Sequence, residues 1–425
     1  MKKSFLLLMA TLLCLQIFAQ ENVKETDKPV EVKVSGFIMN NLFFDNRKNA
    51  DALDGMVLLY PLPPAIDSLG NDLNKVPNLT LLSFASRLKF GISGPDAFGA
   101  KTTGLIEFDF TARSISGSST TAGLRFRQAW AKLNWENTEL LAGRAWHPLA
   151  SIDVVPSVMA LSIGAPFQPF NRSDQVTVTY KAGYLNFIAS ASFQNDYTSN
   201  GPAGKTYAYQ NNSLIPNLHA QVKLKSDNLI IGAGFDYKKL LPRTTVTSPV
   251  YGKIASNGAS VNCAALLAYG QYKTGKLTVS AKTILSSNTS ESLMTGAFGT
   301  VSRDSVTGYE EYTPFRHFFA WGNISYGKKL KGSLFAGYLK NLGTAENILP
   351  HTASAPSVYG LGESIANMLR ITPTLSYTSG KAIIALELEH NITAHGSIDY
   401  YNKAKIINAK KVSGTRLMAT MYYNF

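Results

Sequence analysis

Charged side chains recur at alternate positions in several short stretches of the chain, opposite a set of apolar residues. In residues 82–92, Arg87 and Lys89 alternate with Leu88 and Phe90. Such alternation places charges on one face of a strand and apolar groups on the other. The charges on the polar parity are Arg87, Lys89, Arg113, Arg125, Arg127, Arg144, Lys223, Lys225, Lys282, Arg370 and Arg416, against Glu107, Asp109, Glu387 and Glu389. Basic groups are in excess on that face.

This excess favours recognition of anions rather than covalent chemistry. A guanidinium group binds a carboxylate or phosphate through two parallel hydrogen bonds. Fixed arginines and lysines in a narrow aqueous passage raise the local anion concentration and select against cations. Any one of these residues could instead be solvated or paired with a neighbouring charge. As a set, they predict selection of small anionic or polar solutes.

Residues that could perform catalysis or bind a metal are scattered. The six histidines lie in different segments, at 147, 219, 317, 351, 390 and 395. Neither the His-Glu-x-x-His sequence of zinc proteases nor the Gly-x-Ser-x-Gly sequence of hydrolases occurs. His390 and His395 lie near Asp399, but their five-residue spacing at a strand end points them to opposite faces. We therefore expect a protein that is not an enzyme, with no catalytic residue, metal site or cofactor.

The composition narrows the class of protein. Only 16% of the 425 residues are charged, against about 25% in an average soluble domain. The mean hydropathy of −0.02 excludes a bundle of membrane helices, and 45% apolar residues are enough to bury a core. The net charge of +13 suits anionic partners. Nucleic acid would fit that charge too, but the export signal and the strand pattern described below argue against a nucleic-acid-binding protein.

The first 20 residues resemble an export signal. Lys2 and Lys3 precede an apolar run from Phe5 to Phe18, and Ala19 follows it. Cleavage near Ala19 or Gln20 would leave a single cysteine, so we expect no internal disulfide. That cysteine, Cys263, falls on the apolar parity of its segment. We predict a signal peptide at 1–20, a short N-terminal segment at 21–31 and one folded domain at 32–425.

Sixteen segments of the domain alternate in the manner of strands. They begin near residues 32, 80, 102, 124, 139, 175, 184, 218, 229, 261, 277, 317, 333, 367, 382 and 415. The strands of a soluble β-sandwich also alternate between apolar and polar residues. The lengths of the connections between strands therefore decide between a sandwich and a membrane barrel. Along the chain, short turns such as 181–183 alternate with long loops such as 195–217 and 394–414. This is the layout of an outer-membrane barrel, with short periplasmic turns and long extracellular loops.

The predicted fold is therefore all-β, a 16-stranded antiparallel transmembrane β-barrel. Unpaired backbone groups are costly in hydrocarbon, so a sheet that crosses the membrane must close. The apolar parity would meet lipid and the polar parity would line a water-filled lumen. The location we predict is the outer membrane of a Gram-negative cell.

The last strand ends in an aromatic residue, with Met421, Tyr423 and Phe425 on one parity. This resembles the terminal signal that barrels present to the barrel-assembly machinery. Together with the stretches 34–44, 142–148 and 164–172, the chain resembles the sixteen-stranded trimeric porins, in particular the DcaP-like group. The resemblance implies a homotrimer embedded in lipid and lipopolysaccharide. Some members carry an N-terminal coiled coil, for which segment 21–31 is too short.

The resemblance also implies that the third long loop, about residues 147–174, folds inward as a constriction. If that loop brings Asp153 and Arg172 opposite Arg125, Arg127 and Arg144, the narrowest point would carry a transverse field. The expected function is passive diffusion of small hydrophilic solutes with a preference for anions. The alternative is a structural or adhesive barrel whose lumen is closed by its loops.

Overall fold

The computed structural model describes residues 28–53, 55–83, 85–112, 123–353 and 355–425. The predicted signal peptide and Arg113 lie outside these residues. Within them, no helix has both the length and the apolar character needed to cross a membrane.

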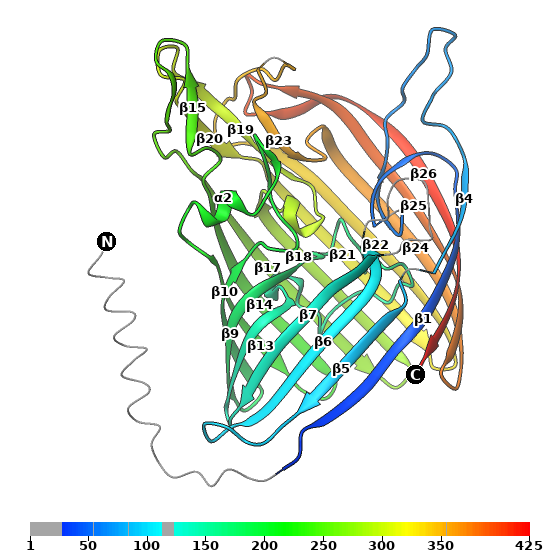
Figure 1. Cartoon of the computed structure of the whole chain (residues 1–425). Helices are drawn as coiled ribbons and strands as arrows, with labels where there is room; N and C mark the ends of the chain where they lie inside the picture. Colours follow the sequence, from blue (N-terminus) through cyan, green and yellow to red (C-terminus); the bar gives the residue numbers. More distant parts are fainter. Residues whose placement is uncertain (1–27, 54, 84, 113–122, 354) are drawn as a thin grey trace.

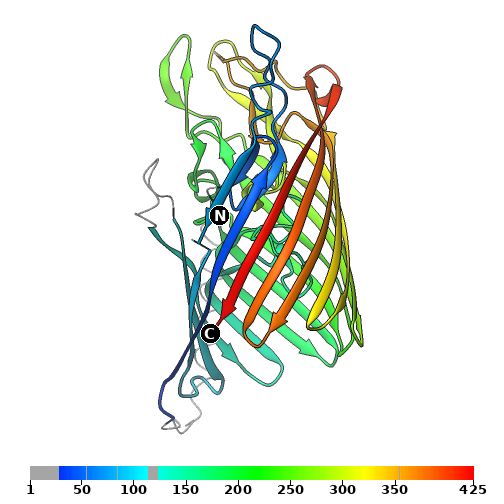
Figure 2. The same cartoon turned by 90° about the vertical axis from the view of Figure 1, so that its right-hand side faces the viewer.

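The chain forms a closed antiparallel β-barrel with tilted strands (Figures 1 and 2). The barrel strands are β1 (Glu31–Asp45), β4 (Asn78–Leu82), β5 (Arg87–Ser93), β6 (Lys101–Ala112), β7 (Gly123–Asn134), β8 (Thr138–Trp146), β9 (Arg172–Ala182), β10 (Leu185–Phe193), β13 (Asn217–Lys225), β14 (Leu229–Leu240), β17 (Val261–Thr274), β18 (Leu277–Ser287), β21 (Arg316–Gly327), β22 (Leu330–Gly343), β24 (Ile365–Ser379), β25 (Ala382–Asp399) and β26 (Lys405–Asn424).

These 17 strands occupy sixteen positions around the barrel, because β4 and β5 share one of them. The upper part of β1 pairs with β4 and its lower part with β5. The barrel closes where Phe37 to Asp45 of β1 pair with Asn424 to Arg416 of β26. The predicted fold class and strand number are confirmed.

Short turns lie at one end of the barrel and long loops at the other (Figure 1). The loops contain further elements: β2 (Asn49–Ala52), β3 (Val57–Pro61), β11 (Asn200–Gly201), β12 (Gly204–Lys205), β15 (Thr245–Ser248), β16 (Gly252–Ala255), β19 (Gly296–Arg303), β20 (Glu310–Pro314), β23 (Val358–Leu361), α2 (Ala208–Asn211) and the 3-10 turns η1 (Pro148–Ala150) and η2 (Ser290–Ser292). Strands β20, β19 and β23 form a small sheet of their own among the loops.

The expectation of a long loop at 394–414 is wrong. β25 and β26 run on past the other strands as a paired ribbon, with Asp399 opposite Lys405. A register shift between His395 and Ser397 breaks the alternation there, so the extension does not look like a strand in the sequence.

The outer face of the barrel is apolar and ends in tyrosines on the side of the turns. Met421, Tyr423 and Phe425 all point outward and are exposed in the isolated chain. The other exposed outward tyrosines near the turns are Tyr180, Tyr184, Tyr272, Tyr326 and Tyr377. A girdle of aromatic rings at this level is typical of barrels that span a membrane.

Candidate functional site

The third long loop, residues 147–171 between β8 and β9, crosses the interior of the barrel. The carboxylate of Glu387 on β25, across the lumen from the loop's origin, accepts hydrogen bonds from the backbone N–H groups of Met159 (2.5 Å) and Ala160 (2.9 Å). On β22, Lys331 donates to the hydroxyl of Ser157. The barrel wall therefore fixes the path of the loop.

The first long loop also enters the barrel, which the alternation of the strands does not predict. Its hairpin β2–β3, called the inner hairpin below, buries Val57, Leu58 and Leu59 almost completely. Residues 56–60 form a short apolar run without alternation, which is typical of a segment buried on all sides. That run is the signal that could have revealed the inner hairpin.

Arg370 holds the inner hairpin, the third loop and the wall together. Its buried guanidinium donates to the carbonyl oxygens of Leu58 (2.9 Å), Leu59 (2.9 Å) and Ala165 (2.7 Å). It also donates to Asn391 at 2.6 Å and Glu389 at 3.2 Å on the neighbouring strand. The expectation that Arg370 lines an aqueous pore is therefore wrong, because its donors are used inside the protein.

The loops and one half of the wall share an apolar core inside the barrel. The core joins residues of the two inward loops to side chains of β17, β18, β21, β22 and β24, among them Leu59, Phe167, Phe170, Leu267, Ile284, Phe319, Trp321, Phe335, Leu339 and Met368. Cys263 is 2% exposed and belongs to a neighbouring inward cluster with Val261 and Phe298. Its predicted lipid-facing position is wrong, since the apolar parity of β17 faces the interior there.

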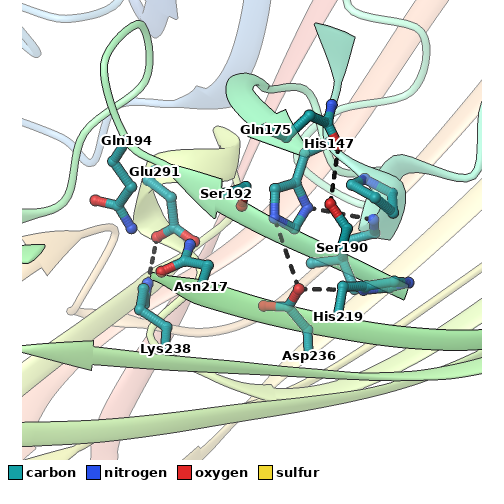
Figure 3. Close-up of polar contacts among 12 residues, drawn as sticks. His147, Gln175, Ser190, Ser192, Gln194, Asn217, His219, Asp236, Lys238 and Glu291 are labelled. Carbon is teal, nitrogen blue, oxygen red and sulfur yellow. Dashed lines mark hydrogen bonds and ion pairs between the residues drawn. The ribbon is translucent and has the colours of Figure 1, made fainter. Parts of the chain in front are cut away.

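The other half of the wall meets the start of the third loop through polar side chains. His147 Nε2 lies 3.6 Å from a carboxylate oxygen of Asp236, and that oxygen lies 3.1 Å from His219 Nδ1 (Figure 3). Lys238, on the same strand β14 as Asp236, donates a hydrogen bond of 2.5 Å to Glu291 (Figure 3). Several buried atoms of this region make no hydrogen bond to a described residue: His147 Nε2, Ser173 Oγ, Ser192 Oγ, Gln194 Nε2 and Asn288 Nδ2. Buried polar atoms of this kind are normally satisfied by water or by a ligand.

The anchoring of the third loop through His147 should depend on pH. Burial lowers the pKa of His147 to about 4; Asp236 opposes this shift, and His219 and Lys238 reinforce it. A neutral His147 therefore stabilises the fold fully above its unfolded pKa of about 6.5, and this contribution is lost as the pH falls towards 4. We expect a loss of the order of 3 kcal/mol in the free energy of unfolding, measured by urea titration at pH 7.5 and 4.5.

His147→Asn should reduce this pH dependence. His351→Asn, which alters an exposed loop histidine, is the matched control and should leave the dependence as in the wild type. An unchanged pH dependence in His147→Asn would contradict the assignment.

Three of the arginines expected at the constriction form a buried ionic cluster with Glu107 and Asp109. Arg127 contacts Glu107 at 2.6 Å and Asp109 at 2.9 Å. Arg125 makes a bidentate pair with Asp109, and Arg87 lies 3.8 Å from Glu107. Arg127 and both carboxylates are at most 1% exposed. Arg125 and Arg127 direct their guanidinium groups at these carboxylates and do not offer them free to a solute.

Arg144 and Arg172 do not lie opposite one another at the narrowest point, which is the arrangement that the expected transverse field requires. The register aligns Arg144 with Asp174 on the same face as Ala142 and Val176, which is the outer face, so its predicted inward position is wrong. Arg144 and Asp174 form a bidentate pair there. Arg172 is fully buried, pairs with Asp196 at 2.9 Å and stacks on aromatic rings such as that of Trp146.

Arg416 and Asp153 are also paired. Arg416 is buried, makes a bidentate contact with Asp45 and donates to the carbonyl oxygen of Gly55 in the first loop. Asp153, in the third loop, lies 2.5 Å from the ammonium group of Lys223. The expectation that Arg416 lines the pore is wrong, whereas Asp153 remains partly exposed beside Lys223.

The most accessible positive charges inside the described part of the barrel are lysines, and most of them are not among the residues that the sequence pattern singles out. They lie on the inward parity below the third loop, towards the turns: Lys89, Lys132, Lys181, Lys223, Lys225, Lys273 and Lys331. We call this set the vestibule lysines. The side chains of Lys89, Lys181 and Lys225 are 39%, 41% and 52% exposed, so solutes can reach them. The inward parity of the strand ends next to the turns is the signal that could have identified them.

Two carboxylates lie among the vestibule lysines. Glu139 pairs with both Lys132 and Lys181. Burial would raise the pKa of Asp153, but the hydrogen bond from Lys223 and the charges of Lys225 and Lys273 hold it below its ordinary value. Each carboxylate is thus outnumbered by ammonium groups. Beneath the third loop, Lys132, Lys223, Trp130 and Tyr269 line a cavity of about 260 Å³.

Comparison with solved structures establishes the fold. The outer membrane channel DcaP of Acinetobacter baumannii matches with a TM-score of 0.66 at 16% identity, over 94% of this chain and 99% of that one. OmpT of Vibrio cholerae matches with a TM-score of 0.54 at 11% identity, over 94% and 99%. An anion-selective porin from Comamonas acidovorans matches with a TM-score of 0.54 at 12% identity, over 93% and 100%. No protein-family model matches the sequence, and no curated protein does either. The predicted resemblance to sixteen-stranded porins is confirmed at the level of the fold.

Proposed function

We propose that this chain is a passive diffusion channel of the outer membrane that prefers small anionic or polar solutes. The third loop sieves solutes by size, since it crosses the lumen and is fixed to the opposite wall. The vestibule lysines supply the anion preference in place of the arginines, which are paired. The excess of accessible ammonium groups over carboxylates below the third loop is the observation that carries this proposal.

Neutralising vestibule lysines should reduce the anion preference. In the triple variant Lys181→Gln, Lys225→Gln and Lys273→Gln, we expect the anion-to-cation permeability ratio to fall at least about twofold, because fixed charges in a narrow passage set the local ion concentrations. Reversal potentials of single channels in a potassium chloride gradient measure this ratio. Lys340→Gln, which removes an exposed charge from the outer face, is the matched control. An equal ratio in the triple variant and the wild type would contradict the assignment.

The second candidate is a structural or adhesive barrel with a closed lumen. The observation in its favour is the apolar core that the two inward loops form with half of the wall. A barrel of this kind would fold and insert but give no conductance steps in a planar bilayer. The conductance measurement therefore separates the two candidates.

The proposed assembly is a homotrimer, inserted through the barrel-assembly machinery by its C-terminal strand. One asymmetry of the outer face supports the trimer. Among the described barrel residues, the outward ion pair Arg144–Asp174 lies on the side of β5 to β10. Paired charges suit contact with another protein copy, whereas the side from β14 to β26 carries unpaired outward cations. We assign that second side to lipid.

A further inference from the structure

The cavity of about 260 Å³ beneath the third loop, called the third-loop cavity below, has an apolar lining although it lies among the vestibule lysines. Trp130, Leu141 and Ile188 line it from β7, β8 and β10 and have the inward parity of these strands. Each of the three is half-buried, and Ile152 of the third loop is 50% exposed beside them. The interior of a barrel that passes hydrophilic solutes is normally polar. Apolar side chains at these accessible positions therefore indicate a solute with an apolar part.

Two ammonium groups and one carboxylate border the apolar lining. Lys132 and Lys223 line the third-loop cavity from the wall, and Asp153 lines it from the third loop. Their side chains are 26%, 16% and 35% exposed, so a solute can reach all three. Asp153 accepts a hydrogen bond of 2.5 Å from Lys223 through Oδ2, whereas its Oδ1 lies 3.9 Å from Lys225, which is too far for a hydrogen bond. Oδ1 can therefore accept from a solute, and each ammonium group has three N–H donors, enough to bind one as well.

The far wall of the third-loop cavity is held in place by hydrogen bonds. The amide of Gln221 donates to the hydroxyl of Tyr269 at 2.6 Å and accepts from the hydroxyl of Ser151 at 3.3 Å. Ser151 belongs to the third loop, so these bonds join the loop to β13 and β17. A cavity whose walls are fixed before the solute arrives loses less entropy on binding than a mobile one.

The charges at the edge of the third-loop cavity complement a zwitterion. An α-amino acid carries a carboxylate, an ammonium group and a side chain on one carbon atom. Ammonium donors and a carboxylate acceptor lie side by side at Lys223 and Asp153, next to the apolar lining. A simple anion would leave Asp153 unused, and a simple cation would be repelled by the lysines. An amino acid with an apolar side chain uses the lysines, the carboxylate and the apolar lining together.

We propose that the third-loop cavity binds α-amino acids with an apolar side chain, such as phenylalanine and leucine. This inference rests on the proposed channel function and names a class of solute for it. The carboxylate of the amino acid accepts hydrogen bonds from Lys132 or Lys223, and its α-ammonium group donates to Asp153. Its side chain lies against Trp130 and Leu141. Because such an amino acid has no net charge near neutral pH, the vestibule lysines do not exclude it.

The test measures the affinity of the full folded protein in detergent for four compounds, by saturation-transfer NMR titration. The compounds are phenylalanine, 3-phenylpropionate, which lacks the ammonium group, 2-phenylethylamine, which lacks the carboxylate, and glycine, which lacks the side chain. We expect phenylalanine to bind at least about tenfold more tightly than each of the others, since each lacks one of the three contacts.

Two variants assign the contacts to residues. Asp153→Asn should weaken the binding of phenylalanine about tenfold and leave that of 3-phenylpropionate as in the wild type, because only the ammonium group contacts Asp153. Asp227→Asn, which alters an exposed aspartate in a short turn, is its matched control. Leu141→Ala should weaken the binding of phenylalanine at least about threefold. Leu140→Ala, which alters the neighbouring side chain on the outer face, should bind as the wild type does.

Equal affinities of the wild type for phenylalanine and 3-phenylpropionate would overturn the inference, as would equal affinities for phenylalanine and glycine. An unchanged affinity for phenylalanine in Asp153→Asn, or an equal loss in Asp227→Asn, would overturn it too. The titration needs no ion current, so it separates this inference from the proposed function. A protein that binds phenylalanine but gives no conductance steps would refute the channel and leave the amino-acid site standing. Conductance steps without binding would refute the site and leave the channel standing.

Discussion

Replacing Arg370 by methionine is expected to destabilise the barrel by roughly 3–5 kcal/mol and to raise its single-channel conductance. The substitution leaves the buried Glu389 without its cation and removes the donors to Leu58, Leu59 and Ala165. Both inward loops then lose their shared attachment to the wall. We expect larger and noisier current steps, because the third loop would sample positions away from the wall.

Urea titration in lipid gives the stability change, and planar bilayer recordings give the conductance. The matched control is Arg316→Met, which removes an outward, exposed guanidinium that makes a single hydrogen bond, to the carbonyl oxygen of Thr344. It should change stability by less than about 1 kcal/mol. If Arg370→Met unfolds like the control and its conductance is unchanged, Arg370 does not hold the loops.

Replacing Arg127 by glutamine is the second change with a large expected effect, on stability rather than on ion selectivity. Arg127 is buried between Glu107 and Asp109, so its loss leaves two carboxylates in a low-dielectric site with fewer cations. Breaking a buried ion pair in this way typically costs about 3–5 kcal/mol. The reversal potential should stay close to that of the wild type, because Arg127 is not exposed to the lumen.

Arg125→Gln serves as the comparison, since Arg125 shares Asp109 but is partly exposed. Its cost should be smaller than that of Arg127→Gln in the same urea titration. A large shift in reversal potential with little loss of stability in Arg127→Gln would contradict the buried cluster. It would favour the selectivity role that the sequence pattern predicts for this residue.

The sequence predicts the barrel well because strand position depends on local information. Alternation and turn residues locate the strand starts within a few residues, as at Val261, Leu277 and Ala382, except for β26, which begins ten residues before its predicted start. Closure follows from the cost of unpaired backbone groups in hydrocarbon. The extension of β25 and β26 could not be predicted, because the register shift after His395 interrupts the alternation of apolar and polar residues.

The interior is harder to predict because it depends on which segments meet. Parity assigns Arg127 and Arg370 to the inward face correctly, but it gives no information about Glu107, Leu58 or Ala165, which occupy their donors. The apolar residues of β17 can be assigned to the inward face only when the inner hairpin and the third loop are known to fill the barrel.

Arg144 shows the opposite failure of the parity rule. An arginine among apolar residues on the outer face is assigned to the lumen by its charge, although the register places it outside with Asp174. The pair is stable there because each charge is satisfied through two hydrogen bonds. Only the partner on β9 explains its position, and that partner is 30 residues away.

The most direct test of the proposed channel is the reversal potential of the purified wild-type protein in a planar bilayer under a tenfold potassium chloride gradient. We expect discrete conductance steps and a reversal potential whose sign reports faster passage of chloride than of potassium. A cation-selective sign would contradict the role of the vestibule lysines, and a folded, inserted protein that gives no steps would contradict the channel itself.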